Sequence, residues 1–165
     1  MVEVVGPTSV HARSITDRLA LVVATVGGVG YSPVAPGTAG SLVAVAILWL
    51  APFSRFGLIA YFIVVTLVGV WAAHRAEGLI GGKDPGAIVI DEVAGMTLSV
   101  LALPLTPAVL VIAFVLFRVF DVVKPPPARG SQSLRGGVGV VVDDLIAGLY
   151  TLAVVGVLRG VLGWP

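Results

Sequence analysis

Six of the nine acidic residues in the chain fall beside breaks in its apolar stretches. Carboxylate oxygens are the ligands that hard divalent cations prefer, whereas zinc sites draw on cysteine and histidine. The chain has no cysteine and only two histidines, so its side chains favour Mg²⁺ over zinc. We therefore predict a magnesium site built from Asp84, Asp91, Glu92, Asp121, Asp143 and Asp144.

Two pairs of these acids are adjacent in sequence. Asp91 and Glu92 enter an apolar helix, and Asp143 and Asp144 follow a glycine-rich loop. Adjacent helical positions point about 100° apart, so each acid of a pair is expected to meet a different partner. Structural roles remain as alternatives. Asp91 could cap the helix while Glu92 pairs with an arginine, and Asp143 and Asp144 could serve as acids that favour a helix N-terminus.

Two further segments could hold a phosphate group. Residues 28–41 are rich in Gly and Pro and are expected to run as a loop into a helix at about Ser41. Exposed amides at such a junction suit an oxyanion, although the pattern is not a Walker A sequence and an ordinary capped loop is the alternative. Arg118, Asp121 and Lys124 recur every third residue before Pro125, which suits an ion network or a phosphate clamp.

The sequence lacks the residues that several other functions require. His11 and His74 are too few for histidine-based phosphatase chemistry, and the chain has neither a Gly-x-Ser-x-Gly nor an Asp-x-Asp signature. A net charge of +1 offers no electrostatic basis for nucleic-acid binding. Carboxylate-plus-metal chemistry with basic phosphate holders remains.

The elements that position these residues are expected to lie in a membrane. The chain is 58% apolar and 12% charged, with a mean hydropathy of +1.08, whereas soluble domains are roughly 45–50% apolar and about 25% charged. A soluble domain with an apolar core buried in an oligomer is the alternative. The length fits one domain, 1–165, in which 1–18 is a polar N-terminal arm rather than a cleaved signal peptide.

The apolar stretches predict an all-α fold, a compact multi-helix membrane bundle, because runs this long favour helices in lipid. Two of the five candidate crossings reach the roughly 17–25 residues that a bilayer requires. If all five cross, residues 1–40, 74–92 and 118–144 share one side with eight of the ten Lys and Arg residues, which indicates the cytoplasm. The loops on that face would form the site. The five candidates are Ser41–Ala51, Phe56–Ala73, Val93–Leu103, Ala108–Phe117 and Leu145–Leu162.

Four segments in this order resemble the phosphatidylglycerophosphatase A family: Gly30–Leu42, Asp84–Met96, Phe117–Pro125 and Gly136–Gly148. The resemblance implies a bacterial cytoplasmic-membrane enzyme that uses Mg²⁺ to convert phosphatidylglycerophosphate and water to phosphatidylglycerol and phosphate. It also implies an all-helical fold in which one helix is surrounded by others. Two features depart from the family pattern. Arg135 stands where a histidine is expected, and residues 126–134 are short and lack an expected aspartate; Arg135 could hold phosphate but not donate a proton.

On this interpretation Asp91, Glu92 and Asp144 are the catalytic residues, with Glu92 as a base for water or Asp91 as a nucleophile. The acids would hold Mg²⁺, and the substrate would be held by Pro36, Gly37, Thr38, Ser41, Arg118, Lys124 and Arg135.

The expected partners are a membrane phospholipid and the lipid bilayer, and the sequence leaves the oligomeric state open. A small ion or solute transporter is the alternative, which would place acids deep in mid-helix along a pore. A non-catalytic member of the fold is a second alternative, raised by Arg135 and the short loop.

Overall fold

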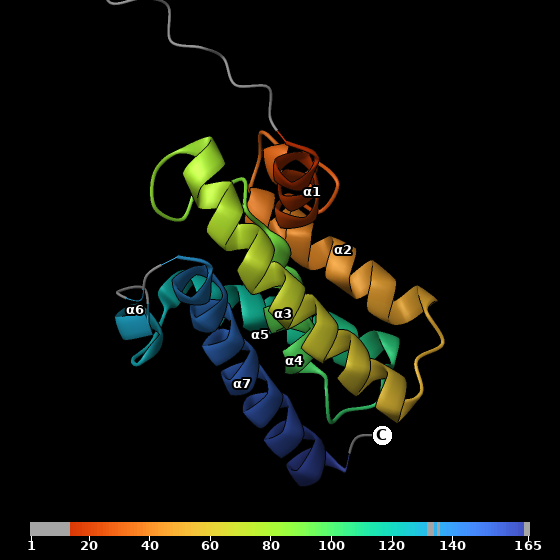
Figure 1. Ribbon diagram of the computed structural model, residues 1–165. Helices are drawn as coiled ribbons and strands as arrows, with labels where there is room; N and C mark the ends of the chain where they lie inside the picture. The colour runs from red at the N-terminus through yellow and green to blue at the C-terminus, as the bar shows by residue number, and fades with distance from the viewer. Residues whose placement is uncertain (1–13, 132–133, 135, 164–165) are drawn as a thin grey trace, which may run out of the picture.

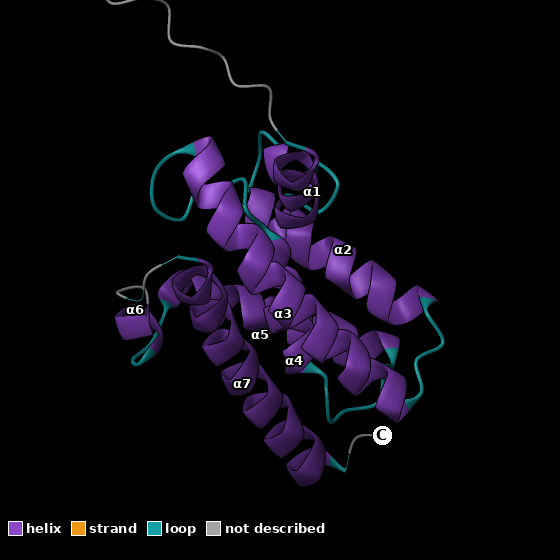
Figure 2. Ribbon diagram, viewed as in Figure 1, coloured by secondary structure: helices purple, strands orange, loops and turns teal. Residues whose placement is uncertain are grey.

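The long apolar stretches form helices, since a helix satisfies its backbone hydrogen bonds within its own segment. The computed structural model describes residues 14–131, 134 and 136–163, and every regular element in these ranges is a helix (Figures 1 and 2). The all-α prediction is confirmed. The elements are α1 (Ile15–Ala24), the 3₁₀ turn η1 (Val29–Tyr31), α2 (Pro36–Leu50), α3 (Arg55–Ile80), α4 (Ile90–Ser99), α5 (Pro107–Val123), α6 (Ala128–Ser131) and α7 (Gly137–Leu162).

Helix α4 forms the centre of the molecule. All ten of its residues are buried, and it contacts α2, α3, α5 and α7. Ten residues of helix span about 15 Å, half of the roughly 30 Å of a hydrocarbon core. Of the five candidate crossings, Val93–Leu103 is therefore not a membrane span but a short helix packed inside the protein. The expectation of one helix surrounded by others agrees with the structure.

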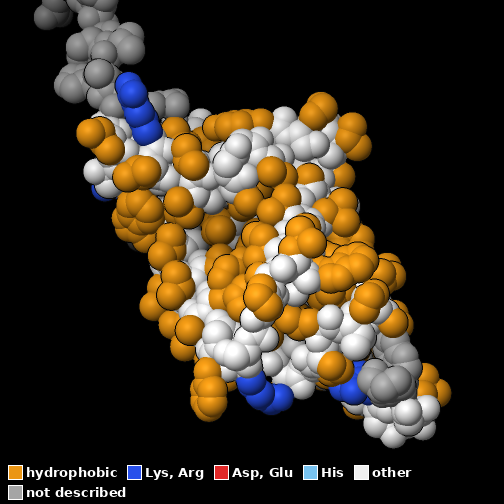
Figure 3. Space-filling view, turned by 90° about the vertical axis from the view of Figure 1, so that its right-hand side faces the viewer, with side chains coloured by type: hydrophobic (Ala, Val, Ile, Leu, Met, Phe, Trp, Pro, Cys, Tyr) orange, Lys and Arg blue, Asp and Glu red, His pale blue; other side chains and the backbone are white. Residues whose placement is uncertain are grey.

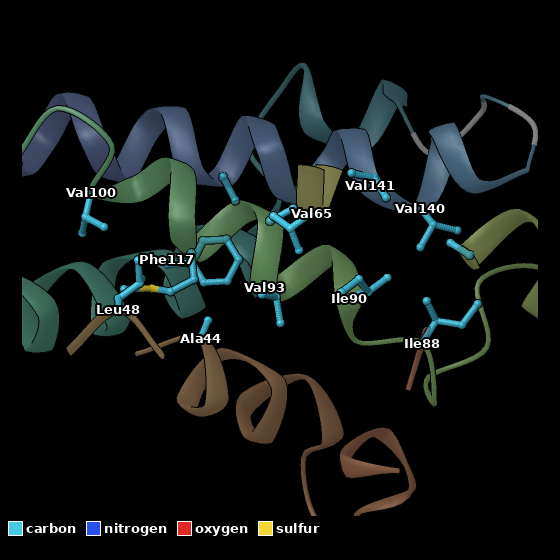
Figure 4. Close-up of a cluster of buried hydrophobic side chains, with 14 of the residues drawn as sticks. Ala44, Leu48, Val65, Ile88, Ile90, Val93, Val100, Phe117, Val140 and Val141 are labelled. Atoms are coloured by element: carbon cyan, nitrogen blue, oxygen red, sulfur yellow. The ribbon is translucent and has the colours of Figure 1, made fainter. Parts of the chain in front are cut away.

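The apolar core surrounds α4 on several sides. Figure 4 shows Val93 of α4 among side chains that come from helices far apart in the sequence. Phe117 of α5 and Leu48 of α2 are the largest of the fully buried side chains. Each contributes about 1.5–3 kcal/mol of apolar burial. This packing fixes the ends of α2, α4, α5 and α7 relative to one another.

Two helices begin earlier than the sequence predicts. The α2 helix starts at Pro36 rather than near Ser41, because proline at the first helical position has a suitable φ and needs no N–H partner. The α7 helix starts at Gly137, so Asp143 and Asp144 lie inside the helix rather than at its start. A Cβ at Gly137 would lie 2.0 Å from the Val70 carbonyl oxygen, so the α3–α7 approach requires glycine there.

Helices α4 and α7 approach each other most closely at a pair of glycines. A Cβ on Gly148 would lie 2.4 Å from the Gly95 carbonyl oxygen, and a Cβ on Gly95 would lie 2.6 Å from the Asp144 carbonyl oxygen. Small residues allow helix backbones to approach in this way. The contact holds the carboxylate of Asp144 against α4.

Gly148→Ala is expected to lower stability by about 1–3 kcal/mol, because the added methyl group overpacks the α4–α7 contact. The matched control is Gly156→Ala in the same helix, where a Cβ would meet no atom within 4 Å. The control is expected to be neutral or slightly stabilising. Thermal unfolding in detergent measures both variants, and equal midpoints would contradict the proposed close packing.

Helices α3 and α7 are long and apolar enough to cross a membrane, with 26 residues each and mean hydropathies of 2.3 and 2.0 in their most apolar windows. They lie against each other and slope the same way across the view in Figure 1. The C-terminal end of α3 and the N-terminal end of α7 face the same end of the molecule, where Gly137 contacts Val70 and His74.

Candidate active site

A cavity of about 340 Å³ opens where α2, α4, α5 and α7 bring their polar ends together. This volume lies at the small end of the usual range for ligand sites, roughly 300–1,000 Å³. Five carboxylates and two cationic side chains line the cavity. Its lining residues are Ala35, Pro36, Gly37, Asp84, Gly86, Ile88, Asp91, Glu92, Arg118, Asp121, Val122, Lys124 and Asp144.

Three of the carboxylates converge on one point. Oxygen atoms of Asp91, Glu92 and Asp144 all lie within 4.8 Å of one another, which is close enough for one metal ion to bind all three. The expectation that Asp91 and Glu92 meet different partners holds for the contact of Glu92 with Arg118 but not at this point, where both side chains converge. Their Cα–Cβ directions diverge, but both side chains lie at the N-terminal turn of α4, where α7 brings Asp144 against them.

These three side chains are almost excluded from solvent, with exposed fractions of 7%, 9% and 2% in chain order. Within the described part of the chain, Asp91 Oδ1, Glu92 Oε2 and Asp144 Oδ2 are buried oxygens that accept no hydrogen bond. Burial, then the charges of Glu92 and Asp144, raises the pKa of Asp91 well above its usual value. Burial likewise raises the pKa of Glu92.

An oxygen-only donor set of this kind fits a hard divalent cation. Buried charges are costly unless they are paired or bind a metal. A cation would supply the missing partners of the three oxygens and hold the carboxylates in their ionised form. The residues therefore fit Mg²⁺, and the pKa directions describe the protein without it.

A chain of ion pairs borders the carboxylates. Arg118 Nη1 lies 2.8 Å from Asp121 Oδ2 and 3.8 Å from Glu92 Oε1, and it donates to Ser41 Oγ at 3.3 Å. Lys124 Nζ lies 3.4 Å from Asp121 and forms a short contact with the buried Asp143. The every-third-residue spacing thus places these groups together, as the sequence predicts.

The charge of Lys124 is maintained by its neighbours. Burial alone would lower its pKa, but the hydrogen bond and charge of Asp143, together with the charge of Asp121, raise the pKa above its usual value. Lys124 therefore stays an ammonium at neutral pH. Asp143 acts here as the partner of Lys124 and does not line the cavity.

The backbone is strained around the cavity. Ala35, Asp84 and Lys124 have positive φ values of 45°, 49° and 47°, and all three line the cavity. Non-glycine residues rarely adopt this region, because it costs about 1–3 kcal/mol of conformational energy for each residue. Residues strained in this way are concentrated at functional sites. The sequence gives no signal for Ala35, because the residue before a proline ordinarily favours extended backbone rather than a positive φ.

The residues predicted to bind phosphate fall into three groups. Pro36 and Gly37 line the cavity, and Ser41 reaches it through its hydrogen bond with Arg118. Thr38, on the first turn of α2, is not among the described residues that line the cavity. Arg135 lies outside the described residues, as do 1–13 of the predicted N-terminal arm.

The main chain of α2 passes directly over the site at Gly37, where a side chain would displace the ends of Glu92 and Arg118. A Cβ on Gly37 would lie 2.1 Å from Glu92 Oε1 and 3.1 Å from Arg118 Nη2. The first N–H groups of a helix have no partner within the helix, so the turn around Gly37 presents donors next to the cavity.

The chain is similar to known lipid phosphatases over most of its length. It is 39% identical over 132 residues to "Phosphatidylglycerophosphatase A" of Escherichia coli, with 77% of this chain and 76% of the relative covered. It is 36% identical to the protein of that name from Haemophilus influenzae, with 78% and 81% covered. A "Putative phosphatidylinositol-3-phosphatase" of Bacteroides thetaiotaomicron is 39% identical over 155 residues, with 88% and 96% covered.

No solved structure matches the chain. The family model described as phosphatidylglycerophosphatase A matches residues 22–159, which include every described residue that lines the cavity. The chain therefore belongs to the phosphatidylglycerophosphatase A family.

Proposed function

We propose that the protein is a Mg²⁺-dependent phosphatase that hydrolyses phosphatidylglycerophosphate to phosphatidylglycerol and phosphate at the cytoplasmic face of a bacterial membrane. The observation that carries this proposal is the buried group of Asp91, Glu92 and Asp144 beside Arg118 and Lys124 in one cavity. Family membership supports the phosphatase activity, and the relatives named as phosphatases do not favour the transporter alternative.

Electrostatics support a metal in this reaction. A cavity with five carboxylates and two cations would repel a phosphate dianion if all the acids were ionised. Bound Mg²⁺ would reduce that repulsion, offset charge on the phosphoryl oxygens and favour a nucleophilic water. Asp91, Glu92 and Asp144 are the residues that would hold it, with Asp84 and Asp121 at the edge of the same cavity.

The side chains in and around the acidic group bind the phosphate and accept the proton. Arg118 and Lys124 hold phosphate oxygens with charge-assisted hydrogen bonds, and the amides at the start of α2 contribute further donors. Glu92 accepts the proton of the attacking water through the carboxylate oxygen that does not bind the metal. Asp91 is the residue for the alternative route through an aspartyl-phosphate.

The exposed surfaces support a place in the bilayer. Large apolar side chains are exposed along α3 and α7, among them Phe56 at 85%, Leu67 at 66% and Val157 at 64%. Figure 3 shows one face on which apolar side chains fill the area between basic side chains at its upper and lower ends. Such an extent of exposed apolar surface is unusual for a soluble monomer.

The two long helices also support the orientation. Each has 26 residues and about 39 Å of length, more than the roughly 30 Å of hydrocarbon. Helix α3 runs from the far end towards the end at which the site lies, and α7 runs back again. Of the described Lys and Arg residues, Arg55 and Arg159 lie at the far ends of α3 and α7, and the others precede α3 or fall between its C-terminal turns and the start of α7. The positive-inside rule then places the site in the cytoplasm.

The direct test is phosphate release by the purified protein from vesicles that contain phosphatidylglycerophosphate, with Mg²⁺ and with EDTA. We expect release with Mg²⁺ and none with EDTA. Vesicles with phosphatidylinositol 3-phosphate form a second arm, because a relative carries that activity in its name. Hydrolysis of this lipid alone would overturn the assigned substrate, and full activity in EDTA would overturn the metal.

Gly37→Ala is expected to lower kcat/KM by about 100-fold, because a methyl group at this position displaces Glu92 and Arg118, and a shift of about 1 Å in reacting groups has an effect of that size. The matched control is Gly78→Ala in α3, where a Cβ would meet no atom within 4 Å. Both variants are compared at equal folded protein by phosphate release. Full activity of Gly37→Ala would show that the site tolerates a side chain there.

A further inference from the structure

Helix α1 is apolar on two opposite faces. Its inner face, with Ala20, Leu21 and Ala24, is buried, and α1 makes its main contacts with α3. On the other side, Ile15, Leu19 and Val22 are exposed at 77%, 54% and 56%. A spacing of four and then three residues places these three side chains in one stripe along the helix. We call this stripe the outer face of α1.

Helix α1 cannot cross a membrane, since its ten residues span about 15 Å. In Figure 1 it is seen almost end on, whereas α3 and α7 are seen from the side. The helix therefore lies across the direction of the two long helices. A short helix that lies across the membrane-spanning direction and has an apolar outer face fits the boundary between headgroups and acyl chains.

The charges on α1 fit the same location. Arg18 is exposed beside the outer face, and a long basic side chain in this position reaches lipid phosphates while its stem covers apolar surface. The capping box of Ser14 and Asp17 begins the helix, and Asp17 also pairs with Arg75 of α3 at 2.7 Å. The ion pair fixes α1 at the C-terminal part of α3, the end at which the site lies.

A backbone contact connects α1 to the site. The Val89 N–H donates to the Ala24 carbonyl oxygen at 2.9 Å, and Asp91 follows two residues later. The chain after α1 is also held closely, because a Cβ on Gly30 would lie 1.9 Å from the Ala87 carbonyl oxygen. The depth of α1 in a membrane would therefore set the depth of the carboxylates.

We propose that α1 is an interfacial helix whose outer face is covered by phospholipid, and that it holds the active site at the depth of the lipid phosphates. Helix α1 packs on α3, whose exposed apolar side chains, such as Leu67 and Trp71, the proposed function places in lipid. The inference rests on that membrane location and adds the position of the site within it.

The chain has no cysteine, so one substitution introduces a single thiol for a spin label. Leu19→Cys is labelled in the full chain, in vesicles of phosphatidylcholine with some phosphatidylglycerol, and its collisions with oxygen and with a water-soluble nickel complex are compared. Leu67→Cys on α3 is the reference for lipid, and Lys83→Cys in the exposed α3–α4 loop is the reference for water. We expect the Leu19 label to favour oxygen, at a depth shallower than the Leu67 label.

Each of the other results of the spin-label measurement would contradict one part of the proposal. A Leu19 label as accessible to nickel as the Lys83 label would overturn the interfacial location. A label inaccessible to both reagents would overturn it in favour of a second protein chain on the outer face. If the Leu67 label is also in water, the membrane location of the proposed function fails, whereas phosphate release would remain to be judged by its own assay.

A functional measurement completes the test. The triple variant Ile15→Ser, Leu19→Ser, Val22→Ser changes side chains on the outer face, so its thermal stability in detergent is expected to be unchanged. Its activity on vesicles is expected to fall about tenfold, with no change on a short-chain, water-soluble phosphatidylglycerophosphate. Equal activity of variant and native protein on vesicles would overturn the proposed positioning.

Discussion

Asp144→Asn is expected to lower Mg²⁺-dependent phosphate release by at least about 100-fold without lowering the stability of the metal-free protein. Asp144 is 2% exposed and lies beside Asp91 and Glu92, so three acids share one buried place. Removing a potential negative charge there relieves repulsion and desolvation in the metal-free state. The same change removes a ligand that the proposed metal needs.

A second measurement separates a metal ligand from a structural acid. Mg²⁺ that binds the folded state raises the Tm by mass action, and this rise is expected in the native protein and lost in Asp144→Asn. A structural acid would give the opposite pattern, with a lower Tm and an unchanged response to Mg²⁺. Asp17→Asn is the comparison for a structural acid, because Asp17 caps α1 and pairs with Arg75 away from the cavity; it is expected to lower the Tm and leave the response to Mg²⁺ unchanged. Full Mg²⁺-dependent activity of Asp144→Asn would contradict the proposed metal site.

The existence of the helices could be predicted from the sequence because long apolar stretches dominate it, but several boundaries could not. Gly and Pro are read locally as helix breakers, so Pro36 and Gly137 were assigned to loops. In the folded protein Gly137 is part of a helix, since it lies where α3 and α7 approach and a side chain would not fit. An apolar stretch such as Val93–Leu103 does not by itself show whether a helix faces lipid or protein, and the apolar residues of α4 face other helices.

The residue types of the site were visible in the sequence, but their grouping was not. Spacing alone predicts the network of Arg118, Asp121 and Lys124, because all three fall within two turns of one helix. The meeting of Asp91 with Asp144 depends on the close α4–α7 packing at Gly95 and Gly148, which no local pattern reveals. Helical geometry also misled the prediction for Asp91 and Glu92, because flexible side chains converge where Cβ directions diverge.

Arg118→Gln is expected to lower kcat/KM by at least about 10³-fold, the size of effect seen when a transition-state arginine is lost. Its guanidinium lies between Glu92, Asp121 and Ser41, where it can bridge the acids and a phosphate group. Removing it also takes from Asp121 the nearer of its two cationic partners, at 2.8 Å, and leaves only Lys124 at 3.4 Å, which alone would destabilise the protein. Loss of activity in this single variant would therefore not separate the two roles.

The double variant Arg118→Gln, Asp121→Asn separates them, since it removes both charges of the Arg118–Asp121 pair. We expect stability to recover towards the native value while kcat/KM stays low and inhibition by inorganic phosphate weakens. Recovery of activity with stability would contradict a direct role in phosphate binding. Arg129→Gln is the control for loss of a basic group at the same end of the molecule, because Arg129 lies on α6 and does not line the cavity.

Arg118→Lys tests geometry at constant charge. The guanidinium is a planar group that can contact an acid on one edge and a phosphate on another, whereas an ammonium is a compact point charge. If Arg118 only balances the charge of Asp121, lysine should restore both stability and activity. We expect lysine to restore stability but leave kcat/KM well below the native value, because a single ammonium cannot contact Asp121 and the substrate phosphate in the same geometry.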